Sequence, residues 1–238
     1  MKRRRAQTDR ICAIVPANVL HLSKARLARH LDASSRSRLS TAMLMDVLCT
    51  LHKVRRIHRI TVVSADFAVR GIARSMRVHF LWEGKRRGLN KGLRLAILDA
   101  KRRNFSAALI LPSDIPLTRS REIGRLLRLS ENYPVALTPS KDGRGTNALL
   151  LRPPGVITPV FGKNSFRRHL SLANREGLSA RIVKSTGIAA DVDNRSDVVI
   201  LKLSSLRNET GRFLRTLDGS ILSSGRQSLI GSVPRRRA

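Results

Sequence analysis

Short apolar runs alternate with amphipathic stretches along most of this chain. The runs, rich in β-branched and aliphatic side chains, predict strands at residues 11–15, 60–64, 78–81, 107–111, 135–138, 148–151 and 181–184. Apolar positions three or four residues apart predict helices at residues 38–51, 67–76, 90–102, 119–129 and 165–176. Asn90 is the expected N-cap of the third helix, and Gly177 is the stop signal of the last. Because strands and helices alternate, the predicted fold class is α/β, a three-layer α/β/α arrangement with helices on both faces of the sheet.

The periodic part of the chain predicts one domain. It spans residues 11–204 of 238, between a basic N-terminal extension at residues 1–10 and a basic tail at residues 205–238, where Ser, Gly and Arg accumulate and predict mobility. The start of the chain has some likeness to a signal peptide. Pro16 and Asn18 interrupt its apolar part and no small-x-small cleavage site follows, so we interpret it as the first strand. No run approaches the roughly 20 apolar residues of a membrane span.

A single carboxylate follows the most apolar run. Residues 107–111 are all aliphatic, which suits a strand buried on both faces, and Asp114 then lies between Pro112 and Pro116. Ligands of open α/β sheets gather at the carboxyl ends of strands, so this position predicts a functional carboxylate. The alternative is that Asp114 caps the next helix, although Thr118 lies closer to the helical pattern.

The charge of the chain narrows the class of ligand. Lysine and arginine number 47 against 16 acidic residues, and the formal net charge of +31 attracts nucleotides, phosphorylated metabolites or nucleic acid. Outside the termini these cations are scattered, which is typical of a solvated basic surface. Aromatic residues make up only 3% of the chain, which leaves few stacking platforms for unpaired bases. Cys12 and Cys49 have no disulfide-framework or C-x-x-C spacing, which favours a reducing, cytoplasmic setting.

Residues 142–147 form a glycine-rich loop between two predicted strands. Gly143, Gly145 and Ala148 match the spacing of a dinucleotide-binding fingerprint, but the residues that follow are strand-like and end at two prolines. They leave no room for the helix that would receive a pyrophosphate, so we reject that interpretation. The loop either exposes backbone N–H groups to an anion or is a plain turn, and the segment alone leaves both open.

Asp191 and Asp193 flank one apolar residue. On an extended segment, residues two apart point to the same side, so both carboxylates face one way while Val192 faces the core. Two such charges repel each other unless a cation lies between them. Together with Asp114 they form a candidate magnesium site, because this hard ion binds a few carboxylates and leaves positions for phosphate oxygens. A solvated turn at residues 193–195 is the alternative.

Other familiar catalytic patterns are missing from the sequence. It has no G-x-x-x-x-G-K-[ST] phosphate loop, no H-E-x-x-H zinc pattern and no G-x-S-x-G elbow. The six histidines show no ligand spacing, and we interpret most of them as ordinary surface or helix residues.

Nine segments, read in order, carry a resemblance to one known family. They are Ile14–Pro16, Ser23–Leu27, Val62–Ser64, Glu83 with Gly88–Asn90, Leu111–Leu117, Pro139–Leu150, Phe161–Phe166, His169–Leu170 and Asp191–Asp193. Together they resemble the CofC/FbiD group of phospholactate or phosphoenolpyruvate guanylyltransferases, which act in the biosynthesis of coenzyme F-420. The resemblance covers roughly residues 11–204.

This resemblance implies a fold and a reaction. The fold is a mostly parallel, mixed sheet of the nucleotidyltransferase, glycosyltransferase-A-like type, and the implied cofactor is Mg²⁺. The implied partners are GTP and a small phosphorylated carboxylic acid, which is phosphoenolpyruvate, 2-phospho-L-lactate or 3-phosphoglycerate. A phosphate oxygen of the acid attacks the α-phosphorus of GTP and pyrophosphate leaves. Because that phosphate is already ionised, alignment and charge neutralisation matter more than a general base.

Residue by residue, the resemblance implies a catalytic centre, a metal site and two binding sites. The catalytic residues are Asp114 and Lys24, and the metal ligands are Asp114, Asp191 and Asp193. The residues that contact the phosphorylated acid are Thr146, Gly162 and Ser165. The residues on the nucleotide side are Lys24, Glu83, Asn90 and Ser113.

Two positions depart from the family pattern. Asn18 stands where a Lys is common, and Arg144 replaces a usual Thr in the glycine-rich loop. The loss of a cation at Asn18 predicts weaker GTP binding, while Arg144 either offsets that loss or admits a different anion such as 3-phosphoglycerate.

Two alternative functions remain open. The charge of +31 also suits a nucleic-acid-binding protein on a catalytically inactive scaffold of this fold. A nucleotidyltransferase with another acceptor, such as a sugar phosphate or a molybdopterin, is the second alternative. The sequence does not indicate the oligomeric state.

Overall fold

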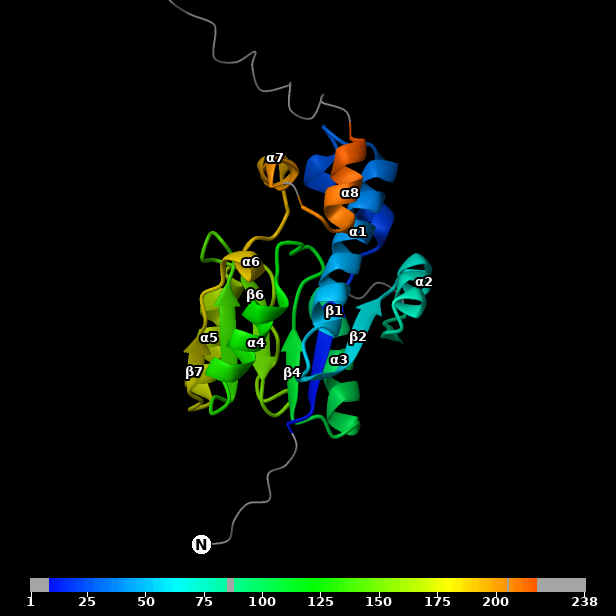
Figure 1. The fold of residues 1–238 in the computed structure, drawn as a ribbon. Helices are drawn as coiled ribbons and strands as arrows, with labels where there is room; N and C mark the ends of the chain where they lie inside the picture. Colours follow the sequence, from blue (N-terminus) through cyan, green and yellow to red (C-terminus); the bar gives the residue numbers. More distant parts are fainter. Residues whose placement is uncertain (1–8, 85–87, 205, 218–238) are drawn as a thin grey trace, which may run out of the picture.

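The computed structural model describes residues 9–84, 88–204 and 206–217 (Figure 1). Residues 1–8 of the predicted N-terminal extension and residues 218–238 of the predicted tail lie outside this part of the chain. Within the described residues, the central element is a seven-stranded sheet in the order β3-β2-β1-β4-β6-β5-β7. The strands are β1 (Ile11–Pro16), β2 (Ile57–Ser64), β3 (His79–Trp82), β4 (Ala107–Ile110), β5 (Val135–Pro139), β6 (Thr146–Leu151) and β7 (Ala180–Ile182).

One strand of the sheet runs against the others. Strand β6 is antiparallel to its neighbours β4 and β5, and the remaining neighbouring pairs are parallel. The first residue of β6 therefore lies at the edge where β1 and β4 end. The predicted mixed, mostly parallel sheet is confirmed.

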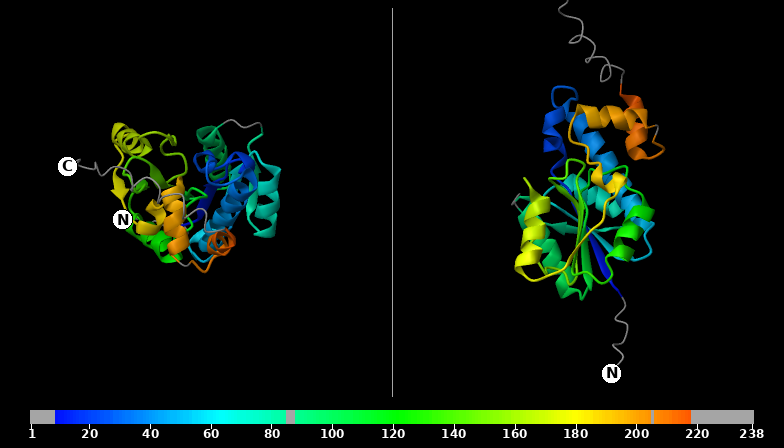
Figure 2. Two further views of the ribbon diagram at one scale, coloured as in Figure 1. Left: turned by 90° about the horizontal axis from the view of Figure 1, so that it is seen from above. Right: turned by 90° about the vertical axis from the view of Figure 1, so that its left-hand side faces the viewer.

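Helices cover both faces of the sheet, as the alternation of elements predicts. They are α1 (Ala33–His52), α2 (Phe67–Ser75), α3 (Leu89–Arg102), α4 (Ser120–Leu129), α5 (Ser165–Arg175), α6 (Thr186–Ala189), α7 (Arg195–Leu203) and α8 (Glu209–Thr216). The apolar sides of α1, α2 and α4 pack on one face, and those of α3 and α5 pack on the other (Figure 2). In the part of the chain that the structure describes, none of these helices has the length and apolarity needed to cross a membrane.

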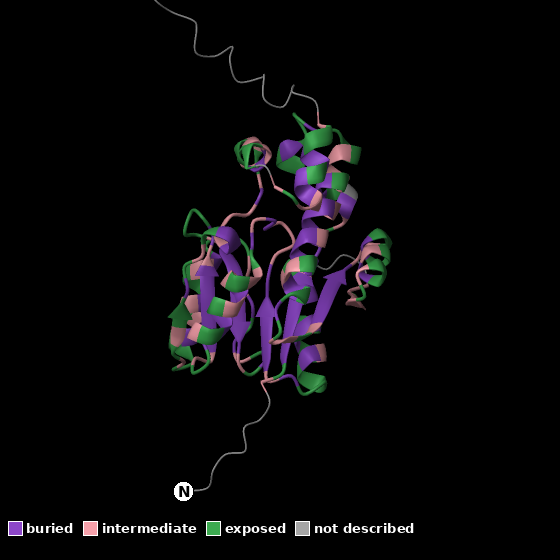
Figure 3. Ribbon diagram, viewed as in Figure 1, coloured by how far each residue is buried: buried purple, intermediate pink, exposed green. Residues whose placement is uncertain are grey.

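The strands lie between two apolar cores because their side chains alternate. In β4 all four side chains are buried, with Ala107 and Leu109 in the core under α1 and α4, and Ala108 and Ile110 in the core under α3 (Figure 3). A strand that is covered on both faces has no solvated side, which explains the unbroken apolar run in the sequence.

A third apolar core lies beyond the carboxyl ends of the strands. The first half of α1 packs there against α7 and α8, and Phe213 and Leu214 of α8 are almost fully buried (Figure 1). Neither α7 nor α8 was predicted, and α8 falls within the segment expected to be a mobile tail. Leu27 and Val192 belong to the same core, so it also fixes the segments around Lys24 and the acidic pair.

A buried carboxylate on α1 fixes the start of α8. The two side-chain oxygens of Asp46 accept hydrogen bonds from the backbone nitrogens of Glu209 and Thr210, each at 2.9 Å. These are two of the N–H groups that a helix leaves without partners in its first turn. Burial raises the pKa of Asp46 above its ordinary value, although both hydrogen bonds oppose that shift. A single charged side chain on α1 therefore anchors α8 to the domain.

We expect Asp46→Ala to lower the free energy of unfolding by about 2 kcal/mol, because two buried N–H groups lose their acceptor. Urea unfolding followed by circular dichroism measures the change. Asp46→Asn, which keeps one acceptor oxygen, is the matched control and should cost less. Wild-type stability in Asp46→Ala would contradict the anchoring role.

Candidate active site

The loop after β4 and the acidic pair meet at the carboxyl edge of the sheet. The backbone oxygen of Asp114 accepts a hydrogen bond from the backbone nitrogen of Val192 at 3.0 Å. Val192 is 1% exposed, so its two acidic neighbours are held on the opposite side of an anchored backbone. The predicted alternation of this segment is therefore confirmed.

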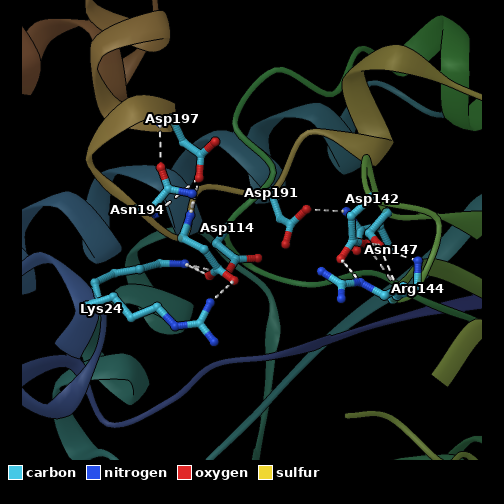
Figure 4. Close-up of polar contacts among 12 residues, drawn as sticks. Lys24, Asp114, Asp142, Arg144, Asn147, Asp191, Asn194 and Asp197 are labelled. Carbon is cyan, nitrogen blue, oxygen red and sulfur yellow. Dashed lines mark hydrogen bonds and ion pairs between the residues drawn. The ribbon is translucent and has the colours of Figure 1, made fainter. Parts of the chain in front are cut away.

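Lys24 lies between two of the three carboxylates. Its Nζ is 2.6 Å from Oδ2 of Asp114 and 3.2 Å from Oδ1 of Asp193, and its side chain is only 9% exposed (Figure 4). Burial disfavours the charged ammonium, but the charges and hydrogen bonds of the two carboxylates together outweigh that penalty and raise the pKa of Lys24. Arg26 adds a weaker contact, 3.4 Å from the other oxygen of Asp193.

The backbone of Lys24 is also unusual. The residue joins two short 3₁₀ helices, Leu20–Leu22 and Ala25–Leu27, and has a φ of 55°, in the left-handed region that a non-glycine residue rarely adopts. Such a conformation costs on the order of 1–3 kcal/mol and persists only where surrounding contacts impose it. Here the ion pairs of the side chain and the burial of Leu27 supply those contacts.

Asp191 is close to the other two carboxylates but has a separate partner. Its Oδ1 accepts a hydrogen bond from Nδ2 of Asn147 at 3.0 Å. Burial raises the pKa of Asp191, the bond from Asn147 opposes that shift, and the charges of Asp114 and Asp193 add to it. Among the described residues, no three acidic, histidine or cysteine side chains form a ready-made metal site. Two of the three predicted aspartates, Asp114 and Asp193, thus meet at the Lys24 ammonium, whereas Asp191 pairs with Asn147.

The glycine-rich loop is held from within. Asp142 accepts hydrogen bonds from the Ser140 hydroxyl at 2.6 Å and from the backbone nitrogen of Arg144 at 3.0 Å. The guanidinium of Arg144 also pairs with this carboxylate, at 2.8 Å. These contacts, that of Ser140 first, hold the pKa of Asp142 well below its usual range. Of the two interpretations, this geometry favours a turn that stabilises itself.

The residues expected to contact the acid lie around the start of α5 and the start of β6. The backbone oxygen of Gly162 accepts a hydrogen bond from the nitrogen of Ser165 at 3.1 Å, and Gly162 has a φ of 117°, which favours glycine. The next residue, Phe166, donates from its backbone to the oxygen of Arg144 at 3.1 Å. The glycine-rich loop is therefore tied to the first turn of α5.

His169 connects these two segments. It is fully buried on α5, with Nδ1 3.0 Å from the Thr146 hydroxyl oxygen and Nε2 2.9 Å from the backbone nitrogen of Val160. Burial, and to a lesser extent the positive charge of Arg168, lowers the pKa of His169 to about 4. His169 therefore links the start of β6 to the loop before α5, a role that the sequence did not assign to it.

Asn90 does not cap α3. The helix begins one residue earlier, at Leu89, and Gly88 occupies the N-cap position. The Asn90 amide instead makes two hydrogen bonds to the backbone of Phe161, from Nδ2 to its oxygen at 3.0 Å and from its nitrogen to Oδ1 at 2.8 Å. Asn90 therefore joins the start of α3 to the loop before Gly162.

One cavity adjoins the charged centre, and a second cavity neighbours the first. One of about 340 Å³ is lined by Lys24, Ser113, Asp114 and Asp193, and Asn18 also borders it. The second cavity, of about 230 Å³, is lined by Asn18, Glu83, Gly88 and Gly92 among others. Asn18 is thus common to both cavities. Glu83 lies against Gly92, since a Cβ there would come within 2.4 Å of its Oε2.

Comparison with known proteins identifies the family of the chain. A family model described as guanylyl transferase CofC like matches residues 11–232. A phosphoenolpyruvate guanylyltransferase from Sphaerobacter thermophilus is 37% identical over 187 residues, which cover 78% of this chain and 89% of that relative. The chain belongs to the CofC-like guanylyltransferase family. Within it, a 2-phospho-L-lactate guanylyltransferase from Methanothermobacter thermautotrophicus is 35% identical over 206 residues, 87% of this chain and 90% of that relative.

Solved structures support the fold of this CofC-like chain. One described as a nucleotide-diphospho-sugar transferase from Desulfovibrio desulfuricans has a TM-score of 0.73 at 18% identity, covering 89% of this chain and 96% of that one. A 4-diphosphocytidyl-2C-methyl-D-erythritol synthase from Anaerococcus prevotii has a TM-score of 0.56 at 10% identity, covering 81% and 96%. These likenesses confirm the predicted nucleotidyltransferase fold.

Three residues of this CofC-like site were missed by sequence reasoning. Asn147 and Arg26 are ordinary polar residues until the fold brings them to the carboxylates, so no local signal marks them. His169 did carry a signal, because Ser165, His169 and Ala173 are four residues apart and form the buried face of α5.

We expect His169 to make the stability of the protein depend on pH. Its folded pKa of about 4 lies below its ordinary value of 6.5, so the unfolded chain binds the proton more tightly. The stabilisation is complete above pH 6.5 and is lost as the pH falls toward 4, by about 3 kcal/mol. Urea unfolding of the wild type and of His169→Gln should give a stability difference that shrinks over this range. A difference that does not vary with pH would contradict the assignment.

Proposed function

We propose that this protein transfers GMP from GTP to a small phosphorylated carboxylic acid and releases pyrophosphate. The observation that carries the proposal is the buried Lys24 ammonium between Asp114 and Asp193, at the edge of the sheet where the two cavities meet. Family membership adds the reaction class, and the names of the relatives add phosphoenolpyruvate and 2-phospho-L-lactate as acceptors. In this proposal the product is an intermediate of coenzyme F-420 biosynthesis.

We assign the cavity next to Glu83 to the nucleotide. A carboxylate accepts hydrogen bonds from the two N–H groups that guanine presents and adenine lacks, which suits Glu83 to the base. Lys24 and Ser113 line the neighbouring cavity, where the phosphates would lie. Asn18 borders both cavities and adds no charge, so Lys24 supplies the cation that an approaching triphosphate meets.

We assign the start of α5 and of β6 to the acceptor. Thr146, Gly162 and Ser165 are joined there by backbone contacts and by His169. Hydroxyl groups at a helix start suit a phosphate, which accepts hydrogen bonds and is favoured by the helix dipole. The guanidinium of Arg144 is paired with Asp142 of its own loop (Figure 4).

The donor set fits a divalent cation such as Mg²⁺. Oxygens of Asp114 and Asp193 converge on one positive charge, and Asp191 lies within electrostatic reach of both. Magnesium binds through one or two carboxylates together with phosphate oxygens, so these aspartates would hold it when the nucleotide is present. A bound Mg²⁺ would neutralise charge on the triphosphate.

Lys24 brings two anions together in this proposal. The acceptor phosphate is already ionised near neutral pH, so no side chain has to remove a proton from it. What opposes the reaction is repulsion between that phosphate and the triphosphate, and a fixed ammonium between them lowers it. Burial strengthens this effect because little water screens the charge.

The expected compartment is the cytoplasm, since Cys12 and Cys49 are both free thiols.

The test is pyrophosphate release from GTP and Mg²⁺ in the presence of phosphoenolpyruvate, 2-phospho-L-lactate or 3-phosphoglycerate. We expect release with at least one acid, together with a product whose mass equals that of the acid plus GMP. No release with any of the three would overturn the proposal. Tight, salt-dependent nucleic-acid binding without turnover would favour the inactive-scaffold alternative, and turnover with only a sugar phosphate would favour a different acceptor.

We expect Gly92→Ala to raise the KM for GTP at least about tenfold, because a Cβ at this position would lie 2.4 Å from Oε2 of Glu83 and displace its carboxylate. Steady-state kinetics with GTP varied measures the change. Gly124→Ala is the matched control, since this helical glycine has open space around it and the substitution should leave KM unchanged. Equal KM values for both variants would remove Glu83 from the nucleotide site.

A further inference from the structure

His169 has a hydrogen-bond partner for each of its ring nitrogens, and the two partners belong to different parts of the acceptor site. Nδ1 meets the hydroxyl of Thr146, the first residue of β6, and Nε2 meets the backbone nitrogen of Val160. The ring is fully buried, so water supplies neither contact.

The Val160 contact determines where the ring hydrogen lies. A backbone N–H can only donate, so Nε2 must be the acceptor and carries no hydrogen. The single hydrogen of the neutral ring is therefore on Nδ1. Burial lowers the pKa of His169 to about 4, which keeps the ring neutral at physiological pH.

The ring hydrogen in turn determines the direction of the Thr146 hydroxyl. Because Nδ1–H donates, the oxygen of Thr146 is the acceptor at 3.0 Å, and its own hydrogen must point elsewhere. Among the described residues, His169 is the one side chain with which this hydroxyl forms a hydrogen bond. The hydroxyl hydrogen is therefore left for a group that can accept a hydrogen bond.

The same ring fixes the loop that leads to Gly162. Val160 is held through Nε2, and the ring of Phe161 lies edge-on to His169 with centroids 5.0 Å apart. Asn90 holds the backbone of Phe161 from the other side by two hydrogen bonds. Thr146 and the loop before Gly162 are thus positioned by one side chain.

We propose that His169 is a positioning residue that commits the Thr146 hydroxyl to donate its hydrogen bond to an ionised phosphate oxygen of the acceptor. This inference rests on the proposed function and extends it, since it assigns the orientation of a phosphate-binding hydroxyl to a residue that does not contact the substrate. A fully ionised phosphate offers acceptor atoms only, and it satisfies the hydroxyl. A group that can only donate at this place, such as an ammonium, would leave the hydroxyl hydrogen without an acceptor.

Two substitutions separate the two bonds of the ring. His169→Gln keeps an acceptor at the position of Nε2 for Val160 and removes the donor to Thr146. His169→Asn keeps a donor at the position of Nδ1 for Thr146 and removes the acceptor for Val160. We expect His169→Gln to raise the KM for the acid about tenfold or more while the KM for GTP stays within about twofold. His169→Asn should keep the KM for the acid within about threefold of the wild type.

A double-mutant cycle tests whether His169 acts through Thr146. Thr146→Val should raise the KM for the acid as much as His169→Gln does, and the double variant should be no worse than either alone. Ser130→Ala, which removes a buried hydroxyl at the opposite edge of the sheet, is the control for general loss of stability and should change neither KM. Additive effects, or an equal rise in both KM values, would overturn the proposal.

Nitrogen-15 NMR of histidine-labelled protein shows directly which ring nitrogen of His169 carries the hydrogen. The signals that disappear in His169→Gln identify this residue, and at neutral pH we expect the hydrogen on Nδ1. A hydrogen on Nε2 would overturn the inference whatever the kinetics show. Failure of the wild type to use any of the three acids would instead count against the proposed function, so the two failures are distinguishable.

Discussion

A buried ammonium group between two carboxylates is the interaction on which the rest of this site depends. Without the charge of Lys24, Asp114 and Asp193 would repel each other, because both oxygens are within 3.2 Å of one nitrogen. The ammonium of Lys24 offsets part of the negative charge of the two carboxylates, while each of the three groups remains ionised. Such a centre can exchange partners when anions and a divalent cation arrive, whereas an apolar contact could not.

The fold supplies this contact from three segments that are far apart in sequence. The loop after β1 provides Lys24, the turn after β4 provides Asp114, and the segment before α7 provides Asp193. The third apolar core holds these segments in register through Leu27 and Val192, and it depends in turn on α8 and its anchor on α1. The left-handed backbone of Lys24 shows that packing imposes a local conformation here that the residue alone would avoid. The stability of α8 is therefore linked to the geometry around Lys24.

The sequence predicted those features whose cause is local. The run at residues 107–111 is apolar throughout because β4 is covered on both faces, and Asp191 and Asp193 flank an apolar residue because Val192 lies in the core. The interpretation of Asn90 as a cap was wrong because the same side-chain amide can bind the backbone of a distant residue, here Phe161, as well as the first turn of its own helix. Asp46 gave no local signal, since its partners, Glu209 and Thr210, come more than 160 residues later. The two ion pairs of Lys24 were also beyond reach, because its position depends on long-range packing.

The most direct test of the central role of Lys24 is the single-turnover rate of GMP transfer in Lys24→Met with both substrates saturating. Methionine keeps the length and apolar stem of the side chain but removes its charge. If the ammonium aligns the two anions and reduces their repulsion, the rate should fall by roughly 100-fold or more while the variant remains folded. A folded Lys24→Met protein that transfers GMP at the wild-type rate would contradict this account.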